Sequence, residues 1–198
     1  ARIAQQGVQA GKVAGVLALG GSAGTTIGTA AMRALPLGVP KLMVSTLASG
    51  AVRAWVQDKD ILMHNSVVDV CGINRISRAV LGNAALAMAG MVRLRSALPE
   101  SGEGESDRPI VAATMFGVTT PAVEFARAVL EEAGYEVLVF HATGNGGQAM
   151  ESLIADGMIA GVLDLTTTEL ADELVGGILS AGPDRLTAAR SEEHTSEL

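Results

Sequence analysis

The sequence predicts an α/β protein made of two units, each built on a parallel sheet. Short apolar runs alternate with helix-compatible segments, and turns rich in Gly, Ser and Thr separate them. The apolar residues are mostly Ala, Val, Leu and Ile, and aromatic residues make up only 3% of the chain. This composition is typical of buried parallel strands covered by helices of small residues.

The first unit spans residues 1–95 and begins with a helical segment. Its predicted elements are, in order, a helix over 1–11, a strand over 13–20, a helix over 27–35, strands over 39–46 and 61–63, and a helix over 67–95. We expect Cys71 to be buried within the last helix, because its neighbours there are small. This lone cysteine excludes an internal disulfide.

Residues 96–109 have the composition of a linker, since Ser, Gly, Glu and Pro dominate them. The second unit spans residues 110–189 and repeats the plan of the first. Its predicted elements are strands over 110–116, 135–140 and 161–165, with helices over 122–133 and 148–155. Residues 190–198 do not fit this pattern. They resemble the translation of a sequencing adapter, and we exclude them from functional reasoning.

The turn after the first strand is the first candidate for phosphate binding. Small residues there let the backbone approach a ligand, and a helix start offers free N–H groups. The spacing is neither a P-loop nor G-x-G-x-x-G. A purely structural role for these glycines is the alternative. The candidate residues in this turn are Gly20, Gly21, Ser22, Gly24, Thr25 and Thr26.

Polar residues also follow other predicted strands, at the edge where ligands of open α/β sheets bind. After the second strand come Ser45, Thr46 and Ser49. In the second unit the corresponding candidates are Thr119, Thr120, Thr143, Gly144 and Gly146. These loops would contact the same ligand or a second one.

His141 and Asp164 are the candidate catalytic residues, because each follows a strand of the second unit. His141 could serve as an acid or base or could fix its loop, and Asp164 could bind a ribose hydroxyl or a metal, or cap a helix. Arg75 and Arg78 share a helix face, and either one of them contacts a phosphate or the acidic second half, or both lie in solvent. No spacing in the sequence indicates a metal cluster.

Charge is distributed unequally along a chain of net charge −7. Residues 1–95 carry ten Lys or Arg against three Asp, whereas residues 96–189 carry three Arg against fifteen acids. The basic charges do not cluster with aromatic residues, which argues against a nucleic-acid ligand. No apolar run reaches the about 18 residues that a membrane-spanning helix needs.

Several stretches resemble the Tm-1-like ATP-binding family, also called UPF0261. They are residues 19–25, 32–41, 65–78, 114–121, 139–147 and 163–169. The resemblance implies two Rossmann-like subdomains, both incomplete in this chain, that bind ATP. The family's plant member blocks viral RNA replication by binding the viral replication protein. The family usually has Gly where this chain has Ala23, and the extra methyl matters if that position needs a positive φ.

We therefore expect a cytoplasmic nucleotide-binding protein whose cofactor is ATP, with or without Mg²⁺, and which forms a homo-oligomer. Two other functions stay open. The chain could be part of a metabolic enzyme that acts on a small phosphorylated or carboxylated substrate through His141 or Asp164. It could instead be an interaction module for a protein partner, with the nucleotide in a structural role. A fragment that lacks edge strands and folds poorly is a further alternative.

Overall fold

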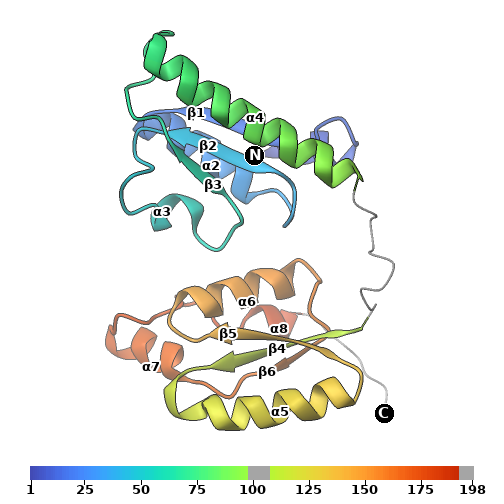
Figure 1. The fold of residues 1–198 in the computed structure, drawn as a ribbon. Helices are drawn as coiled ribbons and strands as arrows, with labels where there is room; N and C mark the ends of the chain where they lie inside the picture. The colour runs from blue at the N-terminus through green and yellow to red at the C-terminus, as the bar shows by residue number, and fades with distance from the viewer. Residues whose placement is uncertain (98–107, 192–198) are drawn as a thin grey trace. The chain divides into compact units, whose positions relative to one another are not determined.

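A computed structural model describes residues 1–97 and 108–191 of the chain. The chain divides into two compact units, Ala1–Glu105 and Ser106–Leu198. Each contains a parallel sheet of three strands with helices on its faces (Figure 1), which confirms the predicted α/β fold. The predicted linker, residues 96–109, lies mostly outside the described residues, although its first two positions belong to a helix.

The sheet of the first unit has the strand order β1-β2-β3. The strands are β1 (Val16–Gly20), β2 (Lys41–Ser45) and β3 (Leu62–Asn65). All pairs are parallel, and Gly20 is in register with Ser45, which is in register with Asn65. Every residue of β2 is buried, as expected for a central strand covered on both faces.

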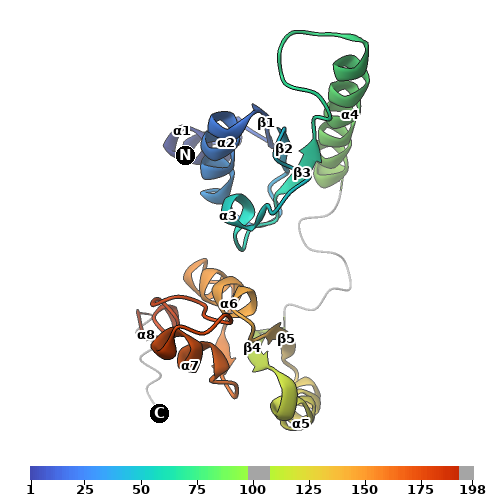
Figure 2. The ribbon, with the colours of Figure 1, turned by 90° about the vertical axis from the view of Figure 1, so that its left-hand side faces the viewer.

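Helices cover both faces of this sheet. They are α1 (Arg2–Gln9), α2 (Ser22–Arg33), α3 (Arg53–Val56) and α4 (Arg75–Ala97). Figure 2 shows α2 and α4 on opposite sides of the strands. On the α4 side, Leu42 and Val44 pack against Ala84 and its helical neighbours. On the α2 side, a Cβ on Gly28 would lie 2.7 Å from the Cβ of Ala18, so only glycine allows the helix to approach this closely.

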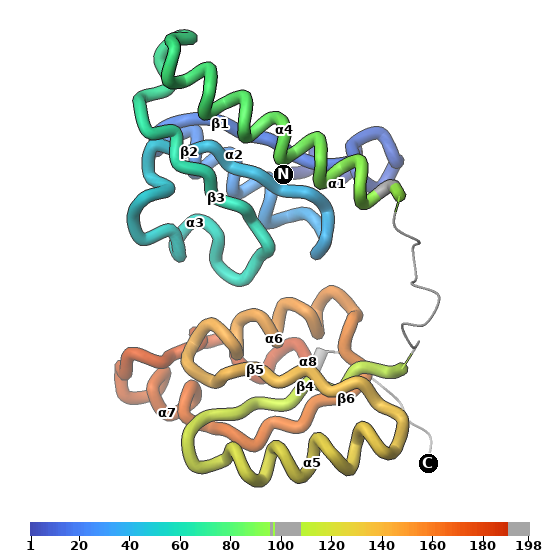
Figure 3. The backbone as a smooth tube through the Cα atoms, in the orientation of Figure 1, coloured from blue at the N-terminus to red at the C-terminus, as the bar shows by residue number. Residues whose placement is uncertain are grey.

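The long helix α4 begins at Arg75, eight residues later than the sequence pattern predicts. Residues 66–74 form a loop that leads from β3 to α4 (Figure 3). Asn74 stops the helix from extending backwards, because its Oδ1 accepts the N–H groups of Ile76 and Ser77 at 2.9 Å each. The Oγ of Ser77 accepts the N–H of Asn74 in return. Cys71 therefore lies exposed in the loop, and the prediction that it is buried in a helix is wrong.

The second unit has the strand order β5-β4-β6, again all parallel. Its strands are β4 (Ile110–Met115), β5 (Glu136–His141) and β6 (Gly161–Leu163). Its helices are α5 (Thr120–Glu132), α6 (Asn145–Ala155), α7 (Thr168–Val175) and α8 (Ala188–Ser191), and a 3₁₀ turn spans Gly117–Thr119. Because the chain crosses from β5 over β4 to β6, α5 and α6 lie on opposite faces of the sheet (Figure 2).

Two apolar clusters fill the two faces of this second sheet. Ala112 packs with Met150 and Ile154 of α6. On the other face, Ala113 packs with Val123 of α5 and Val137 of β5. The loops after β4, β5 and β6 all leave the same edge of the sheet, as the sequence predicts for parallel strands.

Candidate functional site

The carboxyl ends of β1, β2 and β3 lie side by side in the first unit. The register aligns Gly20, Ser45 and Asn65 across the sheet. The loops are joined as well, because the Thr46 N–H donates to the Gly20 carbonyl (3.3 Å) and the Ser66 N–H donates to the Ser45 carbonyl (3.1 Å). The structure thus brings the glycine turn and the Ser45–Ser49 loop together at one edge.

Helix α2 starts in this edge without a side-chain cap. Gly21 is the N-cap residue and no side chain bonds to the first amides of the helix. The N–H groups of Ser22, Ala23 and Gly24 have no acceptor within the helix, because the first intrahelical bond runs from the Thr25 N–H to the Gly21 carbonyl. No acidic residue lies in the first turn. The uncapped helix start is therefore available to an anion.

Gly20 and Gly24 allow the strand to turn sharply into this helix. A Cβ on Gly20 would lie 2.8 Å from the Cα of Gly24, and a Cβ on Gly24 would lie 3.1 Å from the Leu19 carbonyl oxygen. Ala23 is exposed in the first helical turn and is not among the residues with positive φ. Its methyl group therefore does not obstruct the turn.

The hydroxyl groups of Thr25 and Ser45 point into the protein. Both residues are fully buried, and their oxygens lie 2.6 Å apart. Thr25 Oγ1 also donates to the Gly21 carbonyl (2.7 Å), and Ser45 Oγ accepts the Leu47 N–H (3.0 Å). These hydroxyls therefore join α2 to β2, and neither is exposed at the sheet edge.

Other hydroxyls of the candidate set face outward. Ser22 and Ser49 are exposed, Thr46 is half-buried, and within the described chain none of the three hydroxyls has a hydrogen-bond partner. The exposed Thr26 hydroxyl donates to the Ser22 carbonyl (2.9 Å) and accepts the indole N–H of Trp55 at 3.4 Å. The outward hydroxyls surround the uncapped start of α2.

The loop after β3 is strained at the same edge. Val67 has a φ of 65°, a left-handed conformation that is rare for a β-branched residue. Asn65 Oδ1 accepts the Val67 N–H (3.2 Å), and the buried Ser66 hydroxyl donates to the Val68 carbonyl (2.7 Å). Backbone strain of this kind clusters at functional sites.

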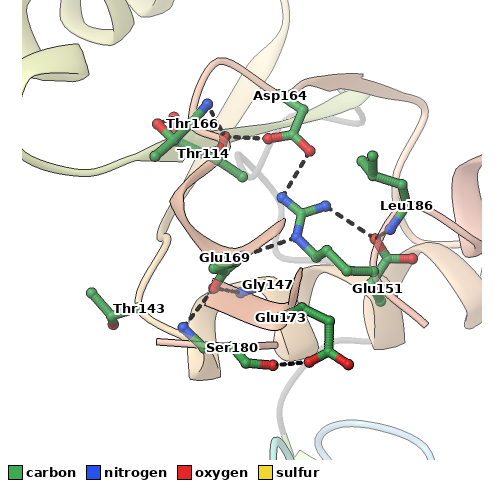
Figure 4. Close-up of polar contacts among 12 residues, drawn as sticks. Thr114, Thr143, Gly147, Glu151, Asp164, Thr166, Glu169, Glu173, Ser180 and Leu186 are labelled. Carbon is green, nitrogen blue, oxygen red and sulfur yellow. Dashed lines mark hydrogen bonds and ion pairs between the residues drawn. The ribbon is translucent and has the colours of Figure 1, made fainter. Parts of the chain in front are cut away.

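The hydroxyl group of Thr119, a candidate residue of the second unit, is hydrogen-bonded within the chain. Thr119 Oγ1 accepts the Phe116 N–H and lies 2.8 Å from Thr166 Oγ1. Thr114 Oγ1 donates to Asp164 Oδ1 (2.6 Å) and accepts the Thr166 N–H (3.1 Å), as Figure 4 shows. Thr120 is the first residue of α5 and is half-buried. Asp164 is thus held in place from β4.

The glycine loop of the second unit surrounds an internal carboxylate. Glu169 is fully buried, and its Oε1 accepts the N–H of Gly144 (2.7 Å) and of Gly147 (3.0 Å) at the start of α6. Thr143 donates to the His141 carbonyl at 3.5 Å. A Cβ on Gly146 would lie 2.0 Å from that same carbonyl oxygen. The Gly144 N–H, which we expected to contact a phosphate, therefore donates to the Glu169 carboxylate instead.

Arg185 connects three carboxylates in this unit (Figure 4). Its Nε donates to Glu169 Oε2 (2.9 Å), its Nη1 to Glu151 Oε1 (3.2 Å), and its Nη2 lies 2.7 Å from Asp164 Oδ2. The last contact is an ion pair without the alignment of a hydrogen bond. Glu151 additionally accepts the N–H groups of Leu186 and Ala188.

Burial by itself lowers the pKa of Arg185, but the hydrogen bond to Glu169 and the charge of Asp164 outweigh burial and raise the pKa above its ordinary value. Because the pKa of Arg185 is higher in the folded state than in the unfolded state, its charged form stabilises the fold at every pH below the unfolded-state pKa. This stabilisation is lost only as the pH rises from there through the folded-state pKa. Arg185 therefore stays cationic throughout the usual working range of pH.

His141 and Asp164 are not brought together. His141 ends β5 and Asp164 follows β6, and these strands lie on opposite sides of β4. Strand spacing puts the outer strands about 10 Å apart. The exposed His141 ring packs edge-on against Phe116, with centroids 5.3 Å apart. Asp164 is engaged by Thr114 and Arg185, so the two residues do not form an acid–base pair.

Sequence reasoning missed Arg185 and Glu151. One signal was present, because Arg185 is the only Lys or Arg between Arg127 and Arg190, in a strongly acidic stretch. A lone cation among so many carboxylates is expected to be paired. Which carboxylates it contacts depends on residues up to 34 positions away, and no local pattern shows that.

Two further features bear on the chemistry. In the part of the chain that the structure describes, no three His, Cys, Asp or Glu side chains gather as metal ligands. A groove of about 610 Å³ lies in the second unit, lined by apolar residues that include Phe125, Val129 and Leu163. Tyr135 is the one lining residue with a polar side chain. This groove therefore offers mainly apolar contacts, with the Tyr135 hydroxyl as its single polar side-chain group.

The fold and the site define a two-unit α/β protein with a strand–glycine turn–helix motif in each unit. The chain belongs to the UPF0261 family. Residues 1–97 match the family model described as "Uncharacterised protein family (UPF0261) N-terminal domain", and residues 108–193 match the one for the C-terminal domain.

Individual relatives agree with this assignment. A UPF0261 protein of Clostridium tetani is 58% identical over 89% of this chain, and one of Mesorhizobium japonicum is 51% identical over 89%. The ToMV resistance protein Tm-1(GCR237) of Solanum lycopersicum is 48% identical over 89% of the chain. The matches cover 43%, 43% and 23% of these relatives, so the chain spans less than half of each.

Among the described residues, no helix combines the length and the apolar character that crossing a membrane requires.

Proposed function

We propose that the first unit binds the phosphate groups of a nucleotide such as ATP at the start of α2. The observation that carries the proposal is the uncapped helix start, where the amides of Ser22, Ala23 and Gly24 lack acceptors within the helix. Such a helix end attracts anions through its free N–H groups and its dipole.

The surroundings of this helix start support the same function. Ser22, Thr46 and Ser49 offer hydroxyl groups that can donate to phosphate oxygens. The first turn of α2 contains no acidic side chain that would repel a phosphate. Arg75 and Arg78 are exposed at the start of α4, which follows the loop that leaves the same sheet edge. In a P-loop, a Lys directly after the last glycine supplies positive charge to the phosphates, and this glycine turn has no such Lys. We therefore assign that role to Arg75 and Arg78.

The test is a thermal-shift titration of the chain with ATP and ADP, with and without Mg²⁺. A ligand that binds only the folded state stabilises it by about 2.7 kcal/mol at a concentration 100 times Kd. Ser22→Asp is the informative variant, because an acid in the first turn stabilises a helix by about 0.3–1 kcal/mol while it repels phosphate. We expect Ser22→Asp to fold and to bind ATP at least about tenfold more weakly, which needs about 1.4 kcal/mol of repulsion.

Ser22→Ala is the matched control, because it removes the hydroxyl but leaves the amides free, and it should keep most of the ATP-dependent shift. A cooperative melt without any shift in the parent chain contradicts the proposal. If Ser22→Asp shows the same ATP-dependent rise in melting temperature as the parent chain, the start of α2 is not the binding site. The expected homo-oligomer, the protein partner and the cytoplasmic location stay predictions, as do enzymatic roles for His141 and for Asp164.

A further inference from the structure

The two units place different groups at equivalent helix starts. In the first unit, the start of α2 has no side-chain cap. In the second unit, the amides of Gly144 and Gly147 at the start of α6 donate to the Glu169 carboxylate. The two glycine loops look alike in the sequence, but only in the second does a carboxylate of the chain itself accept amides of the helix start.

Three donors converge on the carboxylate of Glu169 (Figure 4). Oε1 accepts the two amide N–H groups, and Oε2 accepts Nε of Arg185 at 2.9 Å. Two backbone amides at a helix start and a guanidinium are the donors that proteins use to bind phosphate and carboxylate ligands. Arg185 is an observation independent of the helix, because it is 5% exposed and comes from the segment after α7.

The loop is shaped around this carboxylate. A Cβ on Gly147 would lie 2.1 Å from Oε2 of Glu169, so the carboxylate fills the space that a side chain would need. Gly144 has a φ of 92°, a conformation that favours glycine. With the carboxylate fully buried, no room is left for a second anion at these amides.

We propose that the start of α6 is an oxyanion-binding site whose resident anion is the chain's own Glu169. Glu169 keeps this site closed to phosphate and carboxylate ligands. When its side chain is removed, the site accepts a small carboxylate such as acetate. The proposal does not depend on nucleotide binding in the first unit.

The other contacts of Arg185 keep the site assembled without Glu169. Arg185 still pairs with Glu151 and Asp164, and Asp164 is still held by Thr114. The guanidinium therefore remains neutralised and in place in Glu169→Ala. The two amides stay at the start of α6, because that helix packs on β4 through Met150 and Ile154.

The experiment is an acetate titration of glycine-labelled protein, in which NMR monitors the amide resonances. In Glu169→Ala, the Gly144 and Gly147 resonances should shift with acetate and saturate, whereas chloride at equal ionic strength should leave them unchanged. In the wild type both resonances should stay fixed in acetate. Glu173→Ala is the control, because Glu173 is an exposed acid on the same helix and bonds only to Ser180 among the described residues. It should behave like the wild type.

Two results overturn the proposal. Acetate-dependent shifts of Gly144 and Gly147 in the wild type would show that the site is open. A folded Glu169→Ala protein without acetate-dependent shifts would show that these donors do not form an oxyanion site. If Glu169→Ala folds only in acetate and not in chloride, the proposal is supported, and if neither salt restores folding it fails.

Discussion

A buried pair of hydroxyls, Thr25 and Ser45, joins helix to strand beneath the candidate phosphate site. Their oxygens lie 2.6 Å apart, and both side chains are completely inaccessible. Each hydroxyl also has a backbone partner, so the pair is satisfied. The pair fixes where α2 begins, and thereby where its free amides lie.

Ser45→Ala should destabilise the first unit by about 1–3 kcal/mol, because it leaves the Leu47 N–H without its acceptor and Thr25 without its partner. Ser49→Ala, which removes an exposed hydroxyl from the same loop, should change stability by less than about 0.5 kcal/mol. Urea unfolding of both variants measures the difference. Equal midpoints for the two variants would contradict the structural role of Ser45.

At this scale the sequence predicts residue types better than orientations. The glycine turn at Gly20–Gly24 could be recognised, because small residues and a helix start are local features. Sequence could not tell that Thr25 points inward while Thr26 points outward, since that depends on the position of β2. The contact between Glu169 and Gly144 spans 25 positions and has no local signal.

The start of α4 is the element at which pattern and structure differ most. Val67, Val68 and Val70 continue the apolar pattern of the helix backwards, although they lie in a loop. The reciprocal bonds between Asn74 and Ser77 end that continuation. Asn is a preferred residue at the position just before a helix, and this local signal at Asn74 could have placed the boundary correctly.

Asn74→Ala should lower the stability of the first unit by about 1 kcal/mol through loss of this cap. Asn83→Ala is the control, because Asn83 is exposed within the same helix and alanine there is a better helix former. It should leave stability unchanged or slightly raised. Thermal unfolding followed by circular dichroism measures both, and a larger loss for Asn83→Ala would contradict the assigned helix start.

The strands could be predicted well for a simple reason. Parallel strands covered on both faces are nearly continuous apolar runs, and β2 and β4 both have this character. Their order could not be predicted, because β5-β4-β6 and β1-β2-β3 arise from the same alternation of elements along the chain.

At the scale of the whole molecule, each unit has its own core and its own glycine loop. The loop of the first unit has free amides at the start of α2, and that of the second unit binds Glu169. Similar motifs thus have different surroundings in the two halves of the chain.

The chain should therefore bind one nucleotide, and not two. Calorimetric titration with ATP should give one equivalent per chain in the wild type, because the Glu169 carboxylate already occupies the Gly144 and Gly147 amides of the second loop and would repel a phosphate there. Thr143→Val should leave this stoichiometry and affinity unchanged, whereas Ser22→Asp should weaken the single binding event. Two equivalents, or a loss of binding in Thr143→Val, would contradict the prediction.

Trp55 lies where its fluorescence can report on the first unit. It is the only tryptophan of the chain, and its indole N–H bonds to Thr26 in α2, next to the candidate phosphate site. Indole emission responds to the polarity and hydrogen bonding of its surroundings. Trp55 is thus a built-in fluorescent label for the first unit, and the state of this sheet edge can be followed optically without attaching a dye.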